Sequence, residues 1–260
     1  MRKIAFVSVI FLIIFILIVL LGVSSLIFKA HPDILIKTFK SKEFLFSLKF
    51  SFATSFIALF LSLIFSIPIA YLLSNGEFPQ KRVIESLIDI PIFTPPLVLG
   101  LSFLILFGGK FGSLLEQAGI TFLFSPPGVI FAQFIIITPY VERYIEVGFS
   151  KVNKRYEFIG RSMGLSDFEV FKKITLPLSK DAILAGMITG WGRAISEFGA
   201  TLMIAGATRM RTETLPIAIF LGISSGDMDF AVSTGTLMLA ISFFMRLLMR
   251  RMFKTEDVGY

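Results

Sequence analysis

The stretch Tyr156–Pro177 reads YEFIGRSMGLSDFEVFKKITLP, and the rest of the chain is organised around it. Most of the sequence on either side is apolar enough to lie in lipid, whereas this stretch mixes charged and apolar residues. A segment of that composition lies in water or at a membrane surface. We therefore expect it to be a docking site for another protein.

The stretch predicts two short helices joined by a glycine. Gly164 can adopt the left-handed conformation that ends a first helix near Met163. The run Ser166–Glu169 is a capping box that begins a second helix, and Pro177 is expected to end it. Three residues recur at helical spacing and give the second helix an apolar edge: Leu165, Phe168 and Phe171.

This stretch resembles the cytoplasmic coupling loop of ABC importer permeases, the EAA motif, in which Ile-x-Leu-Pro begins ten residues after a glycine. Residues 158–160 align with the Glu-Ala-Ala part of the motif, so Glu157 is displaced by one position. The resemblance implies a coupling loop over about 151–178. The residues expected to couple the permease to an ATPase are Glu157, Gly164, Leu165, Phe168, Phe171, Ile174, Leu176 and Pro177. The alternative is that the motif is ordinary helix punctuation before the next membrane span.

A second stretch, Trp191–Gly206, reads WGRAISEFGATLMIAG and resembles the helix after the coupling loop in molybdate, tungstate and sulfate permeases. Together the two stretches cover Tyr156–Gly206. The resemblance implies the type I ABC importer permease fold and a homodimer with a central path. It also implies two cytoplasmic ATPase subunits that bind ATP and Mg, and an external binding protein. That protein would deliver an oxyanion, with molybdate or tungstate favoured and sulfate, thiosulfate or another small solute as the alternative.

Composition indicates an integral membrane protein, and the resemblance implies that it is all-α, with one transmembrane permease domain over 1–260. The chain is 55% hydrophobic, contains 31 Phe and has a mean hydropathy of +0.84. Its net charge of +7 comes from Lys and Arg between apolar spans rather than from one patch, so we expect no nucleic-acid partner. The absence of Cys excludes a disulfide framework and a thiolate metal site.

The hydropathy pattern predicts about six membrane spans. The first follows Arg2 and Lys3; it is too long for a signal peptide and no cleavage site follows it, so we expect it to be an anchor. The segment 212–226, interrupted by Pro216, is expected to be a short or re-entrant helix. Pro68 predicts a kink in the second span. The expected spans are 4–28, 50–74, 90–109, 126–149, 181–206 and 230–249.

Six spans place both termini and the coupling loop on one side of the membrane. That side carries 16 Lys and Arg and the other carries 8, which predicts a multi-pass protein of the cell membrane with cytoplasmic termini. The first external loop opposes this rule, because residues 29–49 hold five Lys. His31 also lies there, with nothing nearby to complete a metal or acid–base site.

Several residues at membrane depth are candidates for a translocation path or gate. Prolines free backbone carbonyls, so those of the third span either line a pore or form ordinary kinks. Arg193 and Glu197 lie one turn apart; they either serve an anion's route or neutralise each other and hold two helices together. Gly186, Gly190 and Ala194 predict a close helix approach. The path or gate candidates are Pro95, Pro96, Arg193, Ser196, Glu197 and Thr201.

The sequence lacks the features of other functional classes. It has no phosphate-binding Gly-x-x-x-x-Gly-Lys-Ser/Thr loop, so we expect no cofactor in this chain and ATP hydrolysis on a separate subunit. An intramembrane enzyme would need a Ser with a membrane His, a His-Glu-x-x-His motif or paired membrane Asp residues, and none occurs. A passive scaffold subunit does not explain the docking stretch.

Overall fold

The computed structural model describes residues 2–76 and 78–252, and most of these residues are helical, with no β-strand among them. The predicted all-α fold is confirmed. The elements are α1 (Arg2–Lys29), α2 (Pro32–Phe39), α3 (Lys42–Asn75), α4 (Lys81–Ile88), α5 (Ile90–Phe93), α6 (Pro96–Gly108), α7 (Lys110–Gln117), α8 (Pro126–Ser150), α9 (Lys154–Ser162), α10 (Asp167–Val170), the π-helix η1 (Phe171–Thr175), α11 (Leu176–Leu178), α12 (Lys180–Ile195), α13 (Gly199–Ala205), α14 (Leu215–Ser224) and α15 (Met228–Met252).

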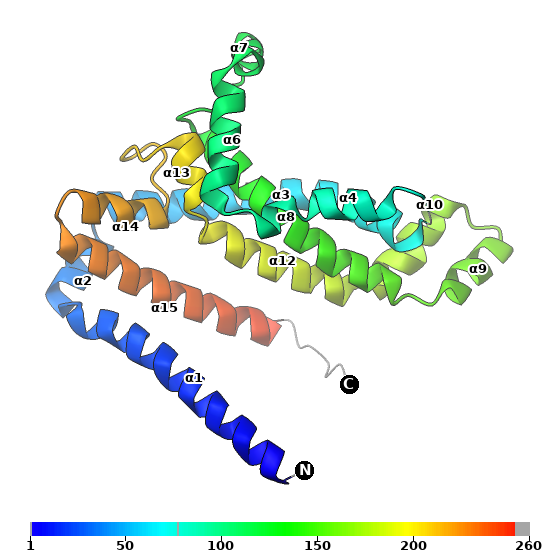
Figure 1. Cartoon of the computed structure of the whole chain (residues 1–260), viewed down its shortest axis with the longest axis horizontal. Helices are drawn as coiled ribbons and strands as arrows, with labels where there is room; N and C mark the ends of the chain where they lie inside the picture. The colour runs from blue at the N-terminus through cyan, green and yellow to red at the C-terminus, as the bar shows by residue number, and fades with distance from the viewer. Residues whose placement is uncertain (1, 77, 253–260) are drawn as a thin grey trace.

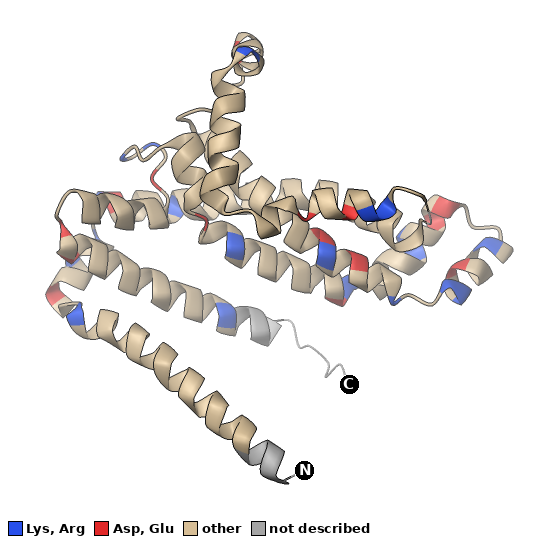
Figure 2. Ribbon diagram, in the orientation of Figure 1, with Lys and Arg blue, Asp and Glu red and all other residues tan. Residues whose placement is uncertain are grey.

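Three helices, α3, α8 and α12, form the centre of the bundle (Figure 1). The hairpin of α9 and α10 lies at one end, and α2 with the α14–α15 turn lies at the other. α6 leaves the body with α7 at its far end, and α1 lies apart from the core beside α15. Charged segments are prominent at the hairpin, whereas α6 and the coloured part of α1 before Lys29 show no charged residue (Figure 2).

Small residues allow the central helices to approach closely. A Cβ added at Gly186 would lie 3.0 Å from the Cβ of Tyr144, and one at Gly190 would overlap the side chain of Val141. This confirms the close approach predicted on α12. The contacting face of α3 likewise carries buried small residues: Ser47, Ser51, Ser55, Ala58, Ser62, Ser66 and Ala70.

The third span, where prolines predicted kinks or a pore lining, is broken into α5 and α6. The fifth is also broken, which corrects the prediction of one helix over 181–206. Thr94 and Pro95 have ψ of 132° because each precedes a proline, and they separate α5 from α6. The fifth span stops at Ile195 and resumes as α13 at Gly199, although no proline intervenes.

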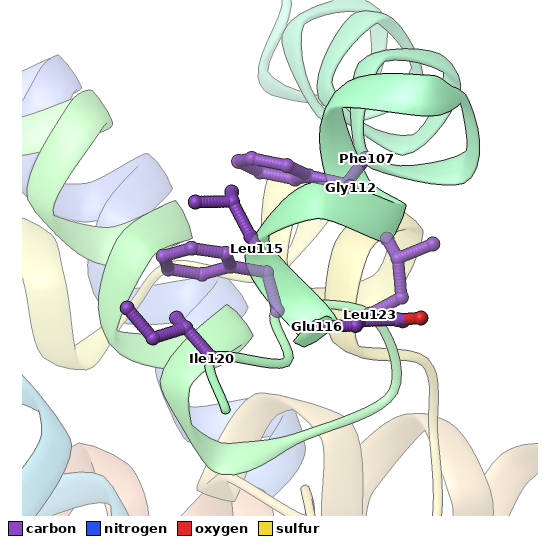
Figure 3. A pocket seen from close by; sticks show the side chains of 7 residues that line it. Phe107, Gly112, Leu115, Glu116, Ile120 and Leu123 are labelled. Carbon is purple, nitrogen blue, oxygen red and sulfur yellow. The ribbon is translucent and has the colours of Figure 1, made fainter. Parts of the chain in front are cut away.

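By length and hydropathy, three of the described helices could cross a membrane: α1, α3 and α15. The pair α6 and α7, bent by 65°, could make a fourth. Figure 3 shows the bend, where the side chains of Leu115 and Ile120 pack around a cavity too narrow for water. A Cβ at Gly112 would overlap the carbonyl of Phe107, so glycine is required for this bend.

The segment 212–226 contains the short helix α14, as predicted. Pro216 does not interrupt it but occupies its first turn, where the missing N–H costs nothing. The N–H of Leu215 donates to Ser51 Oγ on α3 over 2.8 Å, which satisfies a free donor at the helix start. Pro68 lies within α3, which is continuous through it.

Candidate functional site

The turn of the hairpin has the predicted glycine geometry. Gly164 has φ +86° and donates from its N–H to the carbonyl of Arg161 over 2.9 Å, while Leu165 donates to the carbonyl of Gly160 over 3.1 Å. These two bonds form a Schellman motif that ends α9. A side chain at position 164 would meet no atom within 4 Å, so the backbone conformation alone requires glycine.

The second arm begins with the predicted capping box. Glu169 N–H donates to Ser166 Oγ over 3.3 Å, and Ser166 N–H donates to Glu169 Oε2 over 3.0 Å. The hydrogen bond from Lys173, at 2.9 Å, and those from Ser166 lower the pKa of Glu169 to about 2. The capping contact therefore persists as the pH falls and is lost only between about 4.5 and about 2.

The second arm does not end at Pro177, which corrects the prediction. The helix widens into η1, where Leu176 N–H donates to the carbonyl of Phe171, and continues as α11 before Ser179 separates it from α12. Since Pro177 has no N–H, an unbroken α-helix would leave the carbonyl of Lys173 without a donor. The wider turn changes the bonding register ahead of the proline.

Glu157 lies inside the hairpin rather than on its surface. It is 5% exposed, and Thr175 Oγ1 donates to its Oε1 over 2.6 Å. Arg161 Nη2 lies 3.9 Å from its other oxygen, and Arg161 Nε is paired with Asp167 Oδ1 at 2.8 Å. These contacts join α9 to the second arm, so the hairpin is one unit.

Two other predicted coupling residues, Phe171 and Leu176, face the body of the protein, whereas Ile174 packs inside the hairpin. The Phe171 ring lies 4.8 Å from that of Tyr71 on α3 and 6.0 Å from that of Phe149 on α8. Leu176 also packs against the core, and a Cβ at Gly160 would lie 2.6 Å from Ile174 Cδ1. The hairpin is therefore anchored to the ends of α3 and α8.

Five large apolar side chains of the hairpin are exposed, with Met163 the most exposed at 78%. Exposed apolar surface of this kind marks interaction sites. The sequence prediction included only Phe168, although the others carry a readable signal: Tyr156, Ile159 and Met163 recur on one face of α9. The exposed hairpin residues are Tyr156, Phe158, Ile159, Met163 and Phe168. Of the other predicted residues, Gly164 and Pro177 are exposed and Leu165 is half-buried.

The breaks in the third and fifth spans lie against each other. A Cβ at Gly199 would be 3.3 Å from the Cβ of Pro96, and one at Gly100 would be 2.8 Å from the Cα of Ala200. α6 and α13 thus cross at backbone contact, and Pro95 remains exposed beside them.

Glu197 connects the two parts of the broken fifth span. Its Oε2 lies 2.7 Å from Arg193 Nη1, and its Oε1 accepts from the N–H of Ala200 over 2.9 Å. The carboxylate is 1% exposed, whereas the Arg193 side chain is 29% exposed. Gln133 on α8 donates to the carbonyl of Ala194 over 3.2 Å and so caps the end of α12.

The protein family follows from comparison with known proteins. Residues 62–254 match the family described as binding-protein-dependent transport system inner membrane component. The chain belongs to this family. It is therefore an ABC importer permease and not an enzyme, and ATP is hydrolysed on a separate subunit.

Curated relatives share about a third of their residues with this permease. It is 30% identical over 229 residues to a probable transport system permease protein NifC of Clostridium pasteurianum, covering 86% of this chain and 79% of that protein. It is 33% identical over 166 residues to the molybdenum transport system permease protein ModB of Haemophilus influenzae, covering 61% and 72%. A probable sulfate transport system permease protein of Chlorokybus atmophyticus is 32% identical over 197 residues, covering 74% and 69%.

Solved structures share the fold of this permease. A bacterial alginate ABC transporter, in complex with a periplasmic protein that holds an alginate pentasaccharide, has a chain that superimposes with a TM-score of 0.77 at 15% identity. The match covers all of this chain and 96% of that one. The MetNI methionine ABC transporter gives a TM-score of 0.63 at 14% identity, covering 81% and 94%. The type I permease fold expected from the sequence is thereby confirmed.

The remaining path candidates differ in their access to the surface. Ser196 is exposed and donates to the carbonyl of Gly192 over 2.9 Å. Thr201 is fully buried, and its Oγ1 has no hydrogen-bond partner within the described residues. Arg193, Ser196 and Pro95 thus reach the surface of the chain, while Glu197 and Thr201 face its interior.

The described part of the chain contains no group of three or more His, Cys, Asp and Glu side chains that could hold a metal ion.

Proposed function

We propose that this permease imports an oxyanion, most favourably molybdate or tungstate, released to it by an external binding protein. The molybdenum permeases among its relatives support this substrate class. Sulfate permeases at similar identity make sulfate or thiosulfate the second candidate.

The proposed assembly is a homodimer of this chain with two ATPase subunits that bind ATP and Mg, and no cofactor in the permease itself. The observation that supports the ATPase contact is the set of exposed hairpin residues, together with the Thr175–Glu157 hydrogen bond that joins the two arms. Met163 and Phe168 would enter a cleft of the ATPase, because an apolar side chain gains free energy when a partner removes it from water.

Movement of the hairpin would reach the membrane helices through two contacts. Phe171, held between Tyr71 and Phe149, transmits it to α3 and α8. α12 transmits it to the broken span, where Glu197 binds both Arg193 and the start of α13. In this proposal Arg193, Ser196 and Pro95 border the anion path. Glu197 and Thr201 lie behind them and keep the broken span in position.

We place this permease in the cell membrane with both termini in the cytoplasm. The charge count supports that orientation. So does the course of the chain, since α1 runs away from the hairpin end of the bundle and α15 runs back toward it (Figure 1).

The test is uptake into vesicles that contain the permease, its ATPase and the binding protein. We expect ATP-dependent uptake of molybdate or tungstate, and a neutral or cationic solute as the transported species would refute the oxyanion assignment. Met163→Glu should abolish ATPase binding because it charges an apolar contact. The matched control is Met228→Glu, also exposed but at the opposite end, which should bind the ATPase normally.

A further inference from the structure

The segment 29–43, from the last residue of α1 through α2 to the start of α3, carries positive charge that the proposed function does not use. Only Asp33 and Glu43 offset this charge locally. None of the segment's cations forms an ion pair with a carboxylate in the described part of the chain. The exposed cations are Lys29, Lys37, Lys40 and Lys42.

The outward side of α2 is divided into an apolar and a basic stripe. Its inner side, which includes buried Thr38, packs against α15. Outward, Ile36 and Phe39 are 57% and 50% exposed, and Lys37 and Lys40 lie beside them. A helix that exposes an apolar stripe next to a basic one is typical of a helix lying in a membrane interface.

The neighbours of α2 are the helices that face lipid. α2 lies at the end of the bundle where α1 and α15 meet (Figure 1). None of the most apolar stretch of α1 is buried within the chain, and only 17% of that of α15 is buried. Phe28, 88% exposed, and Lys29 end α1 at the level where an apolar run gives way to cations.

We propose that α2 lies in the bilayer interface and binds the phosphate groups of anionic phospholipids. Ile36 and Phe39 would enter the boundary between headgroups and acyl chains, while Lys37 and Lys40 reach the phosphates, with Lys29 and Lys42 beside them. The lipids belong to the leaflet opposite the hairpin, which is the outer leaflet in the proposed orientation. The contact itself does not depend on that orientation or on the transported solute.

An acidic protein surface is the other partner that a basic segment could attract. The location of α2 favours lipid, because its exposed apolar residues lie beside two lipid-facing helices. The exposed cations Arg209 and Arg211 belong instead to the loop after α13, whose helix packs against α6 and α8. These two arginines provide a matched comparison.

The experiment uses the full chain with Phe39→Trp in nanodiscs of phosphatidylcholine and phosphatidylglycerol. Bromine is placed on the acyl chains of one lipid or the other, and quenching of the new indole is measured; Trp191 is 3% exposed and gives a constant background. We expect stronger quenching when phosphatidylglycerol carries the bromine. Adding Lys37→Gln and Lys40→Gln should reduce the preference, by up to about fivefold per lysine.

The control adds Arg209→Gln and Arg211→Gln to the Phe39→Trp chain, which removes two cations elsewhere and should leave the preference intact. Equal quenching by both lipids, or an equal loss in the arginine control, would overturn the proposal. So would loss of the preference on adding inorganic phosphate, which would indicate a site for the free anion, or protection of the indole from both lipids by the binding protein. Because this readout needs no transport, it stands or falls separately from the oxyanion assignment.

Discussion

At the scale of the residue, Glu197 has the most consequential environment in this permease. It is a buried carboxylate with two partners, the Arg193 guanidinium and the Ala200 N–H, and these belong to different helices. The pair is asymmetric, since Arg193 keeps access to the surface and Glu197 does not. Removing the cation therefore leaves a buried charge, whereas removing the anion leaves a partly exposed one.

The first prediction concerns this asymmetry. Arg193→Gln should lower the free energy of unfolding of the purified permease by about 1–3 kcal/mol. Glu197→Gln should cost less, because its amide oxygen can still accept from Ala200. The double variant should recover stability, because neither charge remains. Thermal unfolding in detergent measures all three.

Uptake separates the two roles considered for the pair. A double variant that assembles but fails to transport would place Arg193 on the anion path. Normal transport by the double variant would leave the pair a purely structural role.

The second prediction concerns Glu213, in the loop after α13. Burial raises the pKa of this carboxyl, although the N–H of Met210 donates to it over 2.9 Å and Arg209 lies nearby. Above that raised pKa the folded protein bears the cost of a buried charge, and stability increases as the pH falls through it. Glu213→Gln keeps an acceptor for Met210 and removes the charge.

We therefore expect Glu213→Gln to unfold at the same or a higher temperature than the wild type at about pH 8, with the gap narrowing toward about pH 5. Unfolding curves at both pH values provide the measurement. A variant destabilised at the higher pH would show that the carboxylate makes a favourable contact instead.

At the scale of the element, the hairpin combines local signals with a long-range anchor. Gly164 and the Ser166 capping box define its turn and second helix from adjacent residues alone. Its attachment to the bundle rests on Phe171, which meets Tyr71 and Phe149 from distant parts of the sequence. Apolar residues recur at the same helical spacing whether they face a partner or the bundle. The pattern therefore did not show that Phe168 is exposed and that Phe171 packs inward.

The third prediction tests the turn. Gly164→Val should cost about 1–2 kcal/mol in the hairpin, because a β-branched residue is strained at φ +86° even where space is free. Gly164→Asn is the control, since Asn tolerates the left-handed conformation better. Amide hydrogen exchange over α9 and α10 should rise in the valine variant, with weaker ATPase binding. Normal uptake by that variant would contradict the docking role of the hairpin.

At the scale of the whole molecule, this permease leaves much apolar surface without a protein partner. α1 is separated from the core, and α6 extends from the body beyond its contact with α13. In the proposed assembly, lipid and a second copy of the chain bury this apolar surface.

The fourth prediction concerns the orientation of that assembly. A reporter enzyme fused after Tyr260 should be active in the cytoplasm, because the side of the chain with more Lys and Arg is retained there. A fusion within the loop between α1 and α3 should report the outside. An external C-terminus would invert the orientation and place the hairpin out of reach of ATP.

The sequence alone determined the features that depend on neighbouring residues. Hydropathy over twenty or more residues specified α1, α3 and α15, since covering lipid requires only length and composition. Gly164 and Ser166 specified the hairpin turn, because capping bonds join residues three to five positions apart. Pro95 and Pro96 are the local signal for the break before α6, although a single span was predicted over 90–109.

Tertiary structure decided the features that depend on distant partners. The fifth span breaks at Ser196–Phe198 without a proline, where Gly199 packs against Pro96 and Glu197 joins Arg193 to the start of α13. Likewise Glu157 is enclosed because Thr175 reaches it from the other arm of the hairpin. Whether a charged side chain faces water or protein depends on which helix lies opposite, and a local pattern does not contain that information.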